Sequence, residues 1–341
     1  MKVFISLDYE VFFFKPSSDI KQSLIAPTER FLEILSKTQS KAVFFVDAGY
    51  LYALKRQQNK FDKLAKDYAA IVVQLQFIET QGYEIALHIH PHWEDSYYDG
   101  HRWKMNLNRY KLADYTKVEA EEIFKKYYRE LQSILVHQIV SYRAGGWCIE
   151  PFDYIKDAMK EVGIYIDSTV YQDGYAKTAT HNYDFRKYPK KEFWRFSSSP
   201  AIEDKEGCFF EIAFTSQRFH PILYWKVLFN TLLKRIKKEG NGQGVKPSFK
   251  EVLKKLFTIN TEPVSIDAFK SQLLLKAFKN AEKKGKKYFC VIGHPKCFSE
   301  DTYKNLEQFL AYAKHRGHTI ATFSKLITAD RVPQQQTSIL Y

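Results

Sequence analysis

The feature that most constrains the fold of this chain is a regular alternation of short apolar runs with longer segments of helical spacing. The runs at Val3–Leu7, Lys41–Val46 and Ile85–Ile89 have the length of buried strands, and the segments between them repeat apolar residues three or four positions apart. Strands that alternate with helices form βα units, whose strands pair in parallel in an open sheet or a barrel. The alternation therefore predicts an α/β protein.

The alternation continues along the chain without an internal repeat or a dividing linker. The further predicted strands are 139–142, 164–166, 209–213, 288–292 and 319–323, and the predicted helices are 28–36, 61–80, 118–135, 153–162, 267–284 and 299–314. We therefore expect one domain over residues 1–330, with an insertion at about 215–265 and a flexible tail at 331–341.

Composition narrows the class of protein. Aromatic residues make up 16% and apolar residues 45% of the 341 residues, which is typical of a packed globular protein. The net charge of +13 comes from widely spread lysines without a known nucleic-acid motif, so we expect no nucleic-acid partner. Four cysteines without a CxxC pair favour a reducing compartment. The N-terminus lacks the pattern of a signal peptide and no stretch is apolar enough to span a bilayer, so a cytoplasmic location is predicted.

One segment suggests contact with a membrane. Residues 222–238 repeat apolar side chains at helical spacing and end in a run rich in lysine and arginine. A basic amphipathic helix of this kind either packs its apolar face on the rest of the protein or lies on an anionic membrane. The second alternative would place the protein peripherally at the inner face of the membrane.

A dense group of histidines follows the third predicted strand. His88, His90 and His92 lie within five positions, and imidazole is the commonest metal ligand in proteins. Sites in open α/β sheets and barrels lie at the carboxyl ends of the strands, where this group falls. Pro91 is expected to end regular strand pairing, so periodicity alone does not fix which two of the three histidines bind a metal.

Two carboxylates follow the first predicted strand. Asp8 and Glu10 have the same parity, so an extended backbone directs both side chains to one side. Two acids placed together can divide their tasks, one binding a cation and the other accepting a proton. The spacing does not decide which of the two would bind the metal.

Three later strand ends also carry reactive residues. Arg143 precedes Gly145, Gly146 and Trp147, and glycines allow the backbone to approach a ligand closely. Asp167 follows a short strand, and His294 follows the strand 288–292. If the strands are parallel, these groups meet at the same end of the sheet as the histidines.

This ordered series resembles the polysaccharide deacetylase family (the NodB-homology carbohydrate esterases). That family has an acidic pair, an HxxxH pair, a turn containing arginine, a strand end with aspartate and a late histidine. The matching positions here are Asp8/Glu10, His88–His92, Arg143–Trp147, Asp167 and His294, over residues 2 to about 325. The chain is similar in particular to divergent, unexported members found with bacterial surface-glycan genes.

The resemblance implies a distorted (β/α) barrel of about seven strands and a metal held by Glu10, His88 and His92. It implies Asp8 as general base braced by Arg143, and His294 as general acid tuned by Asp167. Substrate would be bound by Trp93 and by Gly146 and Trp147, whose backbone would help to form an oxyanion hole.

The implied activity is metal-dependent hydrolysis of an N-acetyl or other N-acyl group from an amino sugar of a bacterial surface polysaccharide or its precursor. A divalent ion with two His ligands and one carboxylate suits Zn²⁺, and Co²⁺, Ni²⁺ or Fe²⁺ also fit. The alternative is a non-catalytic glycan-binding protein on the same barrel.

The chain departs from the family pattern at three places. Tyr9 separates the two acids, which are usually adjacent. The arginine turn has two glycines where the family usually has a proline. His90 is an additional histidine that can compete as a ligand.

Overall fold

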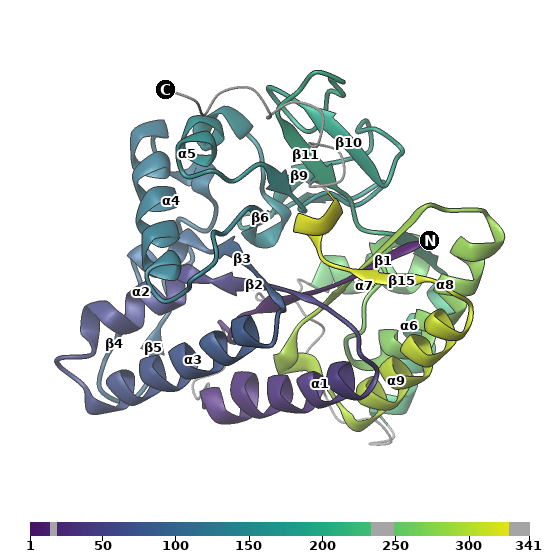
Figure 1. Cartoon of the computed structure of the whole chain (residues 1–341), viewed down its shortest axis with the longest axis horizontal. Helices are drawn as coiled ribbons and strands as arrows, with labels where there is room; N and C mark the ends of the chain where they lie inside the picture. Colours follow the sequence, from purple (N-terminus) through teal and green to yellow (C-terminus); the bar gives the residue numbers. More distant parts are fainter. Residues whose placement is uncertain (14–18, 233–248, 327–341) are drawn as a thin grey trace, which may run out of the picture.

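The computed structural model describes residues 1–13, 19–232 and 249–326, and one twisted sheet with helices around its outside forms its centre (Figure 1). The strands of this sheet are β1 (Lys2–Tyr9), β2 (Val43–Asp47), β3 (Glu84–Ile89), β6 (Ser141–Ala144), β7 (Ile166–Asp167), β10 (Phe193–Phe196), β11 (Phe209–Ile212), β14 (Tyr288–Gly293) and β15 (Thr319–Ala321). The α-helices are α1 (Ala26–Lys37), α2 (Ala48–Gln57), α3 (Asp62–Thr80), α4 (Lys117–Gln132), α5 (Lys156–Glu161), α6 (Pro221–Leu232), α7 (Phe249–Phe257), α8 (Leu274–Lys283) and α9 (Glu300–His315).

The order of the strands places the predicted reactive residues at one end of the sheet. Among the described residues, eight strands follow the path β10-β11-β7-β6-β3-β2-β1-β14, and β15 pairs with β1 beside it. All neighbouring pairs are parallel except β10 with β11. The register sets Asp47 beside His88, and His88 beside Arg143.

The two ends of this path approach each other and nearly close a barrel. The chain that follows β11 donates from the Phe214 N–H to the Val170 carbonyl and from the Thr215 N–H to the Cys290 carbonyl of β14. Ser265 forms a further parallel bridge with Ile292 of β14. The predicted distorted (β/α) barrel is therefore confirmed, with eight strands along its path where about seven were expected.

Side-chain chemistry explains why the elements form where they do. β1, β2 and β14 are buried almost throughout, as expected of parallel strands that are covered on both faces. α4 begins with a reciprocal cap in which Thr116 and Glu119 satisfy each other's backbone N–H groups. The sheet and its helices together bury one continuous apolar core.

The region predicted as an insertion contains a small unit of its own. β12 (Ser216–Phe219) and β13 (Asn260–Pro263) pair antiparallel, and α6 and α7 lie between them in the sequence. Two further hairpins, β4 (Tyr97–Tyr98) with β5 (Trp103–Lys104) and β8 (Tyr175–Lys177) with β9 (Asn182–Asp184), extend from the loops. The predicted tail at 331–341 lies outside the described residues.

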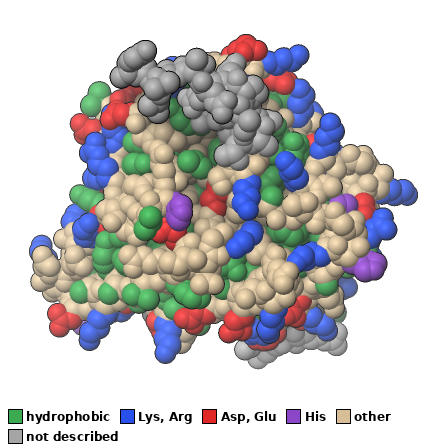
Figure 2. Space-filling view, in the orientation of Figure 1, with side chains coloured by type: hydrophobic (Ala, Val, Ile, Leu, Met, Phe, Trp, Pro, Cys, Tyr) green, Lys and Arg blue, Asp and Glu red, His purple; other side chains and the backbone are tan. Residues whose placement is uncertain are grey.

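The surface seen in Figure 2 carries Lys and Arg side chains spread among acidic ones, without a single basic patch on that face. Within the described part of the chain, every helix is too short or too polar to cross a bilayer.

Candidate active site

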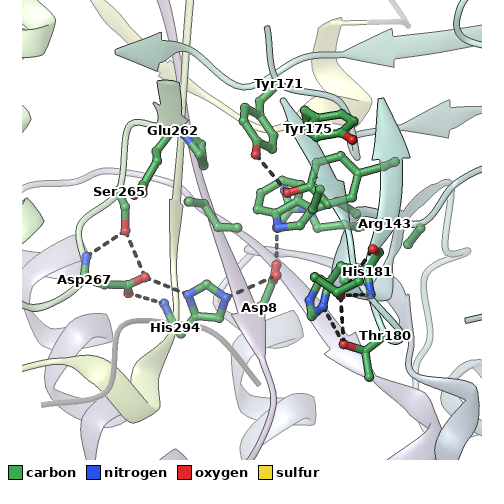
Figure 3. Close-up of a pocket in the computed structure, with 18 of the residues that line it drawn as sticks. Asp8, Arg143, Tyr171, Tyr175, Thr180, His181, Glu262, Ser265, Asp267 and His294 are labelled. Carbon is green, nitrogen blue, oxygen red and sulfur yellow. Dashed lines mark hydrogen bonds and ion pairs between the residues drawn. The ribbon is translucent and has the colours of Figure 1, made fainter. Parts of the chain in front are cut away.

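The strand ends enclose a cavity of about 440 Å³ that contains most of the predicted reactive side chains. Asp8 and Glu10 of the β1 end, His88 and His90 of β3, Arg143 of β6 and His294 after β14 all line it. Figure 3 shows Asp8 between Arg143 on one side and His294 on the other. The cavity therefore joins residues from four strands that are far apart in the sequence.

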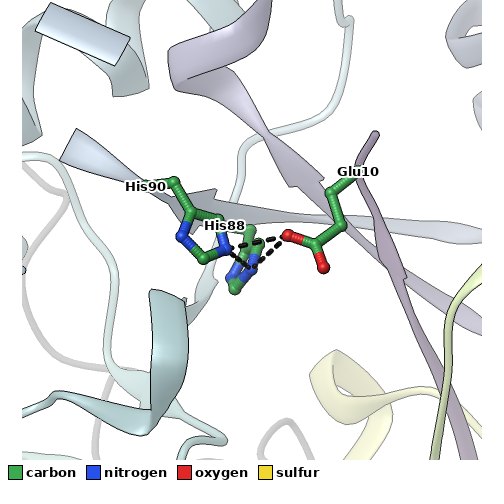
Figure 4. A group of neighbouring side chains, drawn as sticks. All are labelled: Glu10, His88 and His90. Carbon is green, nitrogen blue, oxygen red and sulfur yellow. Dashed lines mark hydrogen bonds and ion pairs between the residues drawn. The ribbon is translucent and has the colours of Figure 1, made fainter. Parts of the chain in front are cut away.

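A carboxylate and two imidazoles meet at one side of the cavity (Figure 4). Glu10 Oε2 lies 2.8 Å from His90 Nε2 and 3.7 Å from His88 Nε2, and the two ring nitrogens are 3.1 Å apart. All three side chains are buried, and Glu10 Oε2 accepts no well-directed hydrogen bond from the described residues. Such an unsatisfied buried oxygen facing two ring nitrogens fits a bound divalent cation.

The second ring nitrogen of His88 supports this interpretation. His88 Nδ1 is 2.9 Å from the backbone carbonyl of Arg143, which can only accept a hydrogen bond. The proton of neutral His88 must therefore lie on Nδ1, and the lone pair on Nε2 faces Glu10 and His90. Metal-binding histidines are commonly held in their tautomer by such a contact to a carbonyl group.

The structure places a different histidine from the predicted His92 beside Glu10 and His88. His90, and not His92, contributes the second imidazole to the group with Glu10 and His88. The strand geometry extends through His90, but Pro91 begins a short 3₁₀ turn over Pro91–Glu94 that turns His92 away. His92 is fully buried against Phe13 and Tyr110, and neither of its ring nitrogens has a hydrogen-bond partner among the described residues.

Arg143 braces the second acid. Its guanidinium is 1% exposed and forms an ion pair with Asp8, while donating to Ser6 Oγ and to the Ser168 carbonyl, each at 2.8 Å. The Arg143 guanidinium also lies 3.7 Å from the centre of the Phe45 ring. Burial opposes ionisation of Asp8, but Arg143, followed by His88 and His294, outweighs it and holds the pKa of Asp8 below its usual value. Asp8 is thus an ionised carboxylate with a fixed orientation.

His294 occupies the other side of the cavity. Its Nε2 lies 3.5 Å from Asp8 Oδ2 and 3.8 Å from Glu10 Oε1, and its Nδ1 lies 2.7 Å from Asp267 Oδ2. Burial alone would lower the pKa of His294, but the carboxylates of Asp267 and Asp8 outweigh it and raise that pKa to about 9. His294 is therefore protonated at neutral pH.

The carboxylate on the Nδ1 side of His294 is Asp267, where the sequence predicted Asp167. Asp267 follows the short segment that bridges to β14, and it also accepts the backbone N–H of His294 at 2.7 Å and the hydroxyl of Ser265 at 2.9 Å. Asp167 lies instead beside Glu211, its register partner, and accepts from the Thr169 hydroxyl. Burial raises the pKa of Asp167, and its hydrogen bonds with Glu211 and Thr169 offset this only in part.

Two of the three predicted substrate-binding residues line the cavity. Gly146 and Trp147 both adopt positive φ angles, 60° and 66°, which turn the backbone sharply at the cavity wall. A side chain at Gly145 would come within 2.6 Å of His90 Nδ1, so the turn requires glycine there. Trp93 is different, because it is buried and donates from Nε1 to Asp47 Oδ2 at 2.7 Å.

Two other features of the site were not predicted from the sequence. Lys296 carries a fully buried ammonium that donates to Glu10 Oε1 at 2.7 Å. One wall of the cavity is aromatic and is lined by Trp147, Tyr171, Tyr175 and Tyr183, with the Trp147 and Tyr171 ring centres 5.0 Å apart. A lysine one residue after a proline, and tyrosines in a hairpin, give no distinctive signal in a single sequence.

Comparisons with known proteins identify the fold. No protein-family model and no curated protein sequence matches the chain. A Mycobacterium smegmatis protein provisionally described as a polysaccharide deacetylase is similar in structure, with 15% identity, a TM-score of 0.53 and coverage of 100% of this chain and 93% of that one. The PuuE allantoinase is similar at 12% identity with a TM-score of 0.54, covering 98% and 91% of the two chains.

A probable polysaccharide deacetylase from Pseudomonas aeruginosa PAO1 also matches, at 11% identity with a TM-score of 0.50, covering 98% of this chain and 91% of that one. Likeness at such low identity identifies the fold, and the reaction must be argued from the site. The chain has the (β/α) barrel fold of these polysaccharide deacetylases.

Proposed function

We propose that the protein is a metal-dependent hydrolase that removes an N-acetyl or other N-acyl group from an amino sugar of a bacterial surface polysaccharide or its precursor. The observation that carries the proposal is the presence, in one cavity, of a Glu–His–His ligand group beside a separate ionised aspartate and a protonated histidine. Amide hydrolysis needs these components: a means to activate water, a base and an acid for the departing amine. The fold shared with polysaccharide deacetylases makes a sugar the favoured substrate class.

Glu10, His88 and His90 would hold the ion, and Zn²⁺ suits this donor set, as do Co²⁺, Ni²⁺ and Fe²⁺. A divalent ion there would lower the pKa of a bound water and polarise the acyl carbonyl. The Arg143 carbonyl keeps the His88 ring in the tautomer that directs Nε2 to the group.

Asp8 is the base of the proposed reaction. Arg143, which also donates to Ser6, holds Asp8 so that one carboxylate oxygen faces the cavity, 3.9 Å from His88 Nε2 and 3.5 Å from His294 Nε2. There it can accept the proton of the attacking water. Arg143 occupies the other oxygen, so only one face of the carboxylate is available to the reaction.

His294 is the acid of the proposed reaction. The nitrogen of an amide leaves readily only when it is protonated, and His294 carries a proton on Nε2 that points into the cavity. Asp267 holds the Nδ1 side of the ring and stabilises the imidazolium. Asp267 is therefore the positioning residue that we assign in place of Asp167.

The cavity wall provides the sites for substrate. The backbone at Gly146 and Trp147 would stabilise the oxyanion of the tetrahedral intermediate, a contact typically worth about 3–4 kcal/mol. The rings of Trp147, Tyr171 and Tyr175 form an aromatic wall on which the apolar face of a sugar can pack.

One observation favours a second candidate, a glycan-binding protein without catalysis. Lys296 already supplies a buried positive charge to Glu10, so the acid is neutralised without a metal ion. A protein that had lost its metal would keep its fold through such an ion pair.

Release of acetate from N-acetylated sugars, measured after chelation and after addition of Zn²⁺ or Co²⁺, separates the two candidates. The proposal expects release only with metal, and expects His294→Ala to bind metal normally while losing turnover. Metal binding without acetate release from any amino sugar or glycan would support the glycan-binding protein. Loss of metal in His294→Ala would contradict the division of roles between the two sides of the cavity.

A further inference from the structure

The hairpin of α6 and α7 carries an unusual concentration of exposed apolar side chains. Eight of the fifteen large hydrophobic side chains that are exposed in the described residues lie between positions 222 and 259. Ile222, Phe229 and Phe257 are 69%, 60% and 67% exposed. Large contiguous apolar patches on a protein surface mark sites of interaction with membranes or other proteins.

The two helices form one continuous patch. Ile222, Trp225 and Phe229 are three and four positions apart on α6, so they share one face of that helix. Trp225 lies against Phe257 of α7, with ring centres 5.8 Å apart, and its Nε1 donates to the Leu256 carbonyl at 2.8 Å. The opposite sides of the helices face the protein, since Leu256 is buried and the Tyr224 hydroxyl donates to Glu262. The apolar face therefore points outward.

The positive charge of residues 221–260 favours an anionic partner. Residues 221–260 contain nine Lys and Arg residues and two acids, so they contribute about half of the net charge of +13. Lys226 and Lys254, which lie beside the apolar residues, are exposed. Tryptophan and phenylalanine flanked by lysine on one helical face are typical of helices that lie in the interface of an anionic bilayer.

We propose that the apolar face of α6 and α7, with its flanking lysines, docks the protein on the surface of a membrane that contains anionic lipid. The sequence left open whether this helix packs on the protein or lies on a membrane, and the exposed face supports the second alternative. Lys254 and Lys255 of α7 also line the active-site cavity, so docking would bring the cavity close to the lipid headgroups. The proposal concerns binding alone, and it does not depend on the hydrolysis proposed above.

The full-length protein should co-sediment with vesicles of equal parts phosphatidylcholine and phosphatidylglycerol, and much less with vesicles of phosphatidylcholine alone. Ile222→Ser combined with Phe229→Ser should weaken binding to the anionic vesicles about tenfold or more, because two apolar side chains would no longer enter the interface. Lys226→Glu should weaken binding less, and high salt should also weaken it.

Val73→Ser combined with Phe77→Ser is the matched control. These side chains of α3 are 67% and 51% exposed and lie on another helix, so their loss should leave vesicle binding unchanged. Equal thermal stability of both double variants would show that the fold is intact. Failure of the wild-type protein to bind anionic vesicles, or an equal loss in both double variants, would overturn the proposal. The wild-type protein could instead self-associate without binding vesicles, and Ile222→Ser combined with Phe229→Ser could abolish that self-association. This result would also overturn the proposal and identify a second copy of the chain as the partner.

Discussion

His90 and His294 lie on either side of the acids of β1, and both are buried, yet their pKa values move in opposite directions. Burial lowers the pKa of His90 to about 4, since Glu10 only partly compensates for the loss of water. Asp267 and Asp8 overcome the same effect at His294 and raise its pKa to about 9. The difference shows that the placement of carboxylates decides the direction in which the pKa of a buried imidazole moves here, and the pKa of His88, which faces both Asp8 and Glu10, is likewise raised.

The two acids, Asp8 and Glu10, also face different partners. Glu10 faces His88 and His90, whereas Asp8 is fixed by Arg143 and faces His294. We refer to Glu10, His88 and His90 as the ligand side, and to Asp8, Arg143, His294 and Asp267 as the acid–base side. If this division is correct, substitutions on the ligand side should remove the metal, whereas substitutions on the acid–base side should lower turnover and keep the metal.

The largest effect is expected for Asp8→Asn and His294→Ala. Loss of a general base or acid typically lowers turnover about 10²–10⁴-fold. Both variants should keep their metal, because neither residue belongs to the ligand side. Steady-state kinetics together with metal analysis tests this, and a variant that loses both metal and turnover would remove the distinction.

Arg143→Met tests whether the acid–base side is held together by its buried ion pair. Removing one member of such a pair leaves an uncompensated charge and typically costs about 3–5 kcal/mol of stability. The exposed pair of Lys63 and Asp67 is the matched control, because Lys63→Met should cost at most about 1 kcal/mol. Denaturant unfolding measures both, and equal losses would show that Arg143 has no special role.

Asp267→Asn tests the acid–base side through its dependence on pH. His294 has its pKa raised above the ordinary value of 6.5, so the stability that it contributes is complete below pH 6.5 and is lost as the pH rises through about 9. Turnover that needs protonated His294 should decline over the same range. Asp267→Asn should move this decline to lower pH and should destabilise the metal-free protein at neutral pH but not above pH 9. A pH–rate profile that does not move would exclude Asp267 as the positioning residue.

Ser265→Ala should have the smallest effect, with the opposite sign. Its hydroxyl donates to Asp267 Oδ2, and removal of that donor leaves more of the carboxylate charge to stabilise the His294 imidazolium. The decline of turnover should therefore move slightly to higher pH. NMR titration of the His294 ring can resolve this shift, and a downward shift would be inconsistent with the assignment.

The fold and most of the site could be predicted from the sequence, because both depend on local patterns. Apolar strands that alternate with helices predicted a parallel sheet or a barrel, and the resemblance to polysaccharide deacetylases implied the distorted barrel. Reactive residues at strand ends predicted that Asp8, Glu10, His88, Arg143 and His294 would meet, because parallel strands end at the same edge.

Two residues could not be assigned because their positions depend on a turn and on a long-range bridge. The 3₁₀ turn that begins at Pro91 rotates His92 out of the group, and the sequence does not specify how sharply the chain turns there. Asp267 reaches His294 because Ser265 pairs with Ile292, a contact between segments that are separate in the sequence. The only local signal was the pattern Val264-Ser265-Ile266-Asp267, which resembles the other strand ends but was interpreted as the approach to a helix.

The metal content of His90→Ala and His92→Ala, purified in parallel and loaded with Zn²⁺ under identical conditions, tests most directly which side chains hold the ion. The two substitutions remove the same atoms from neighbouring buried positions, so losses of packing should be similar. His92→Ala should bind one equivalent of metal, and His90→Ala should bind none or bind it far more weakly. Retention of metal by His90→Ala with loss from His92→Ala would show that His92, and not His90, is the ligand.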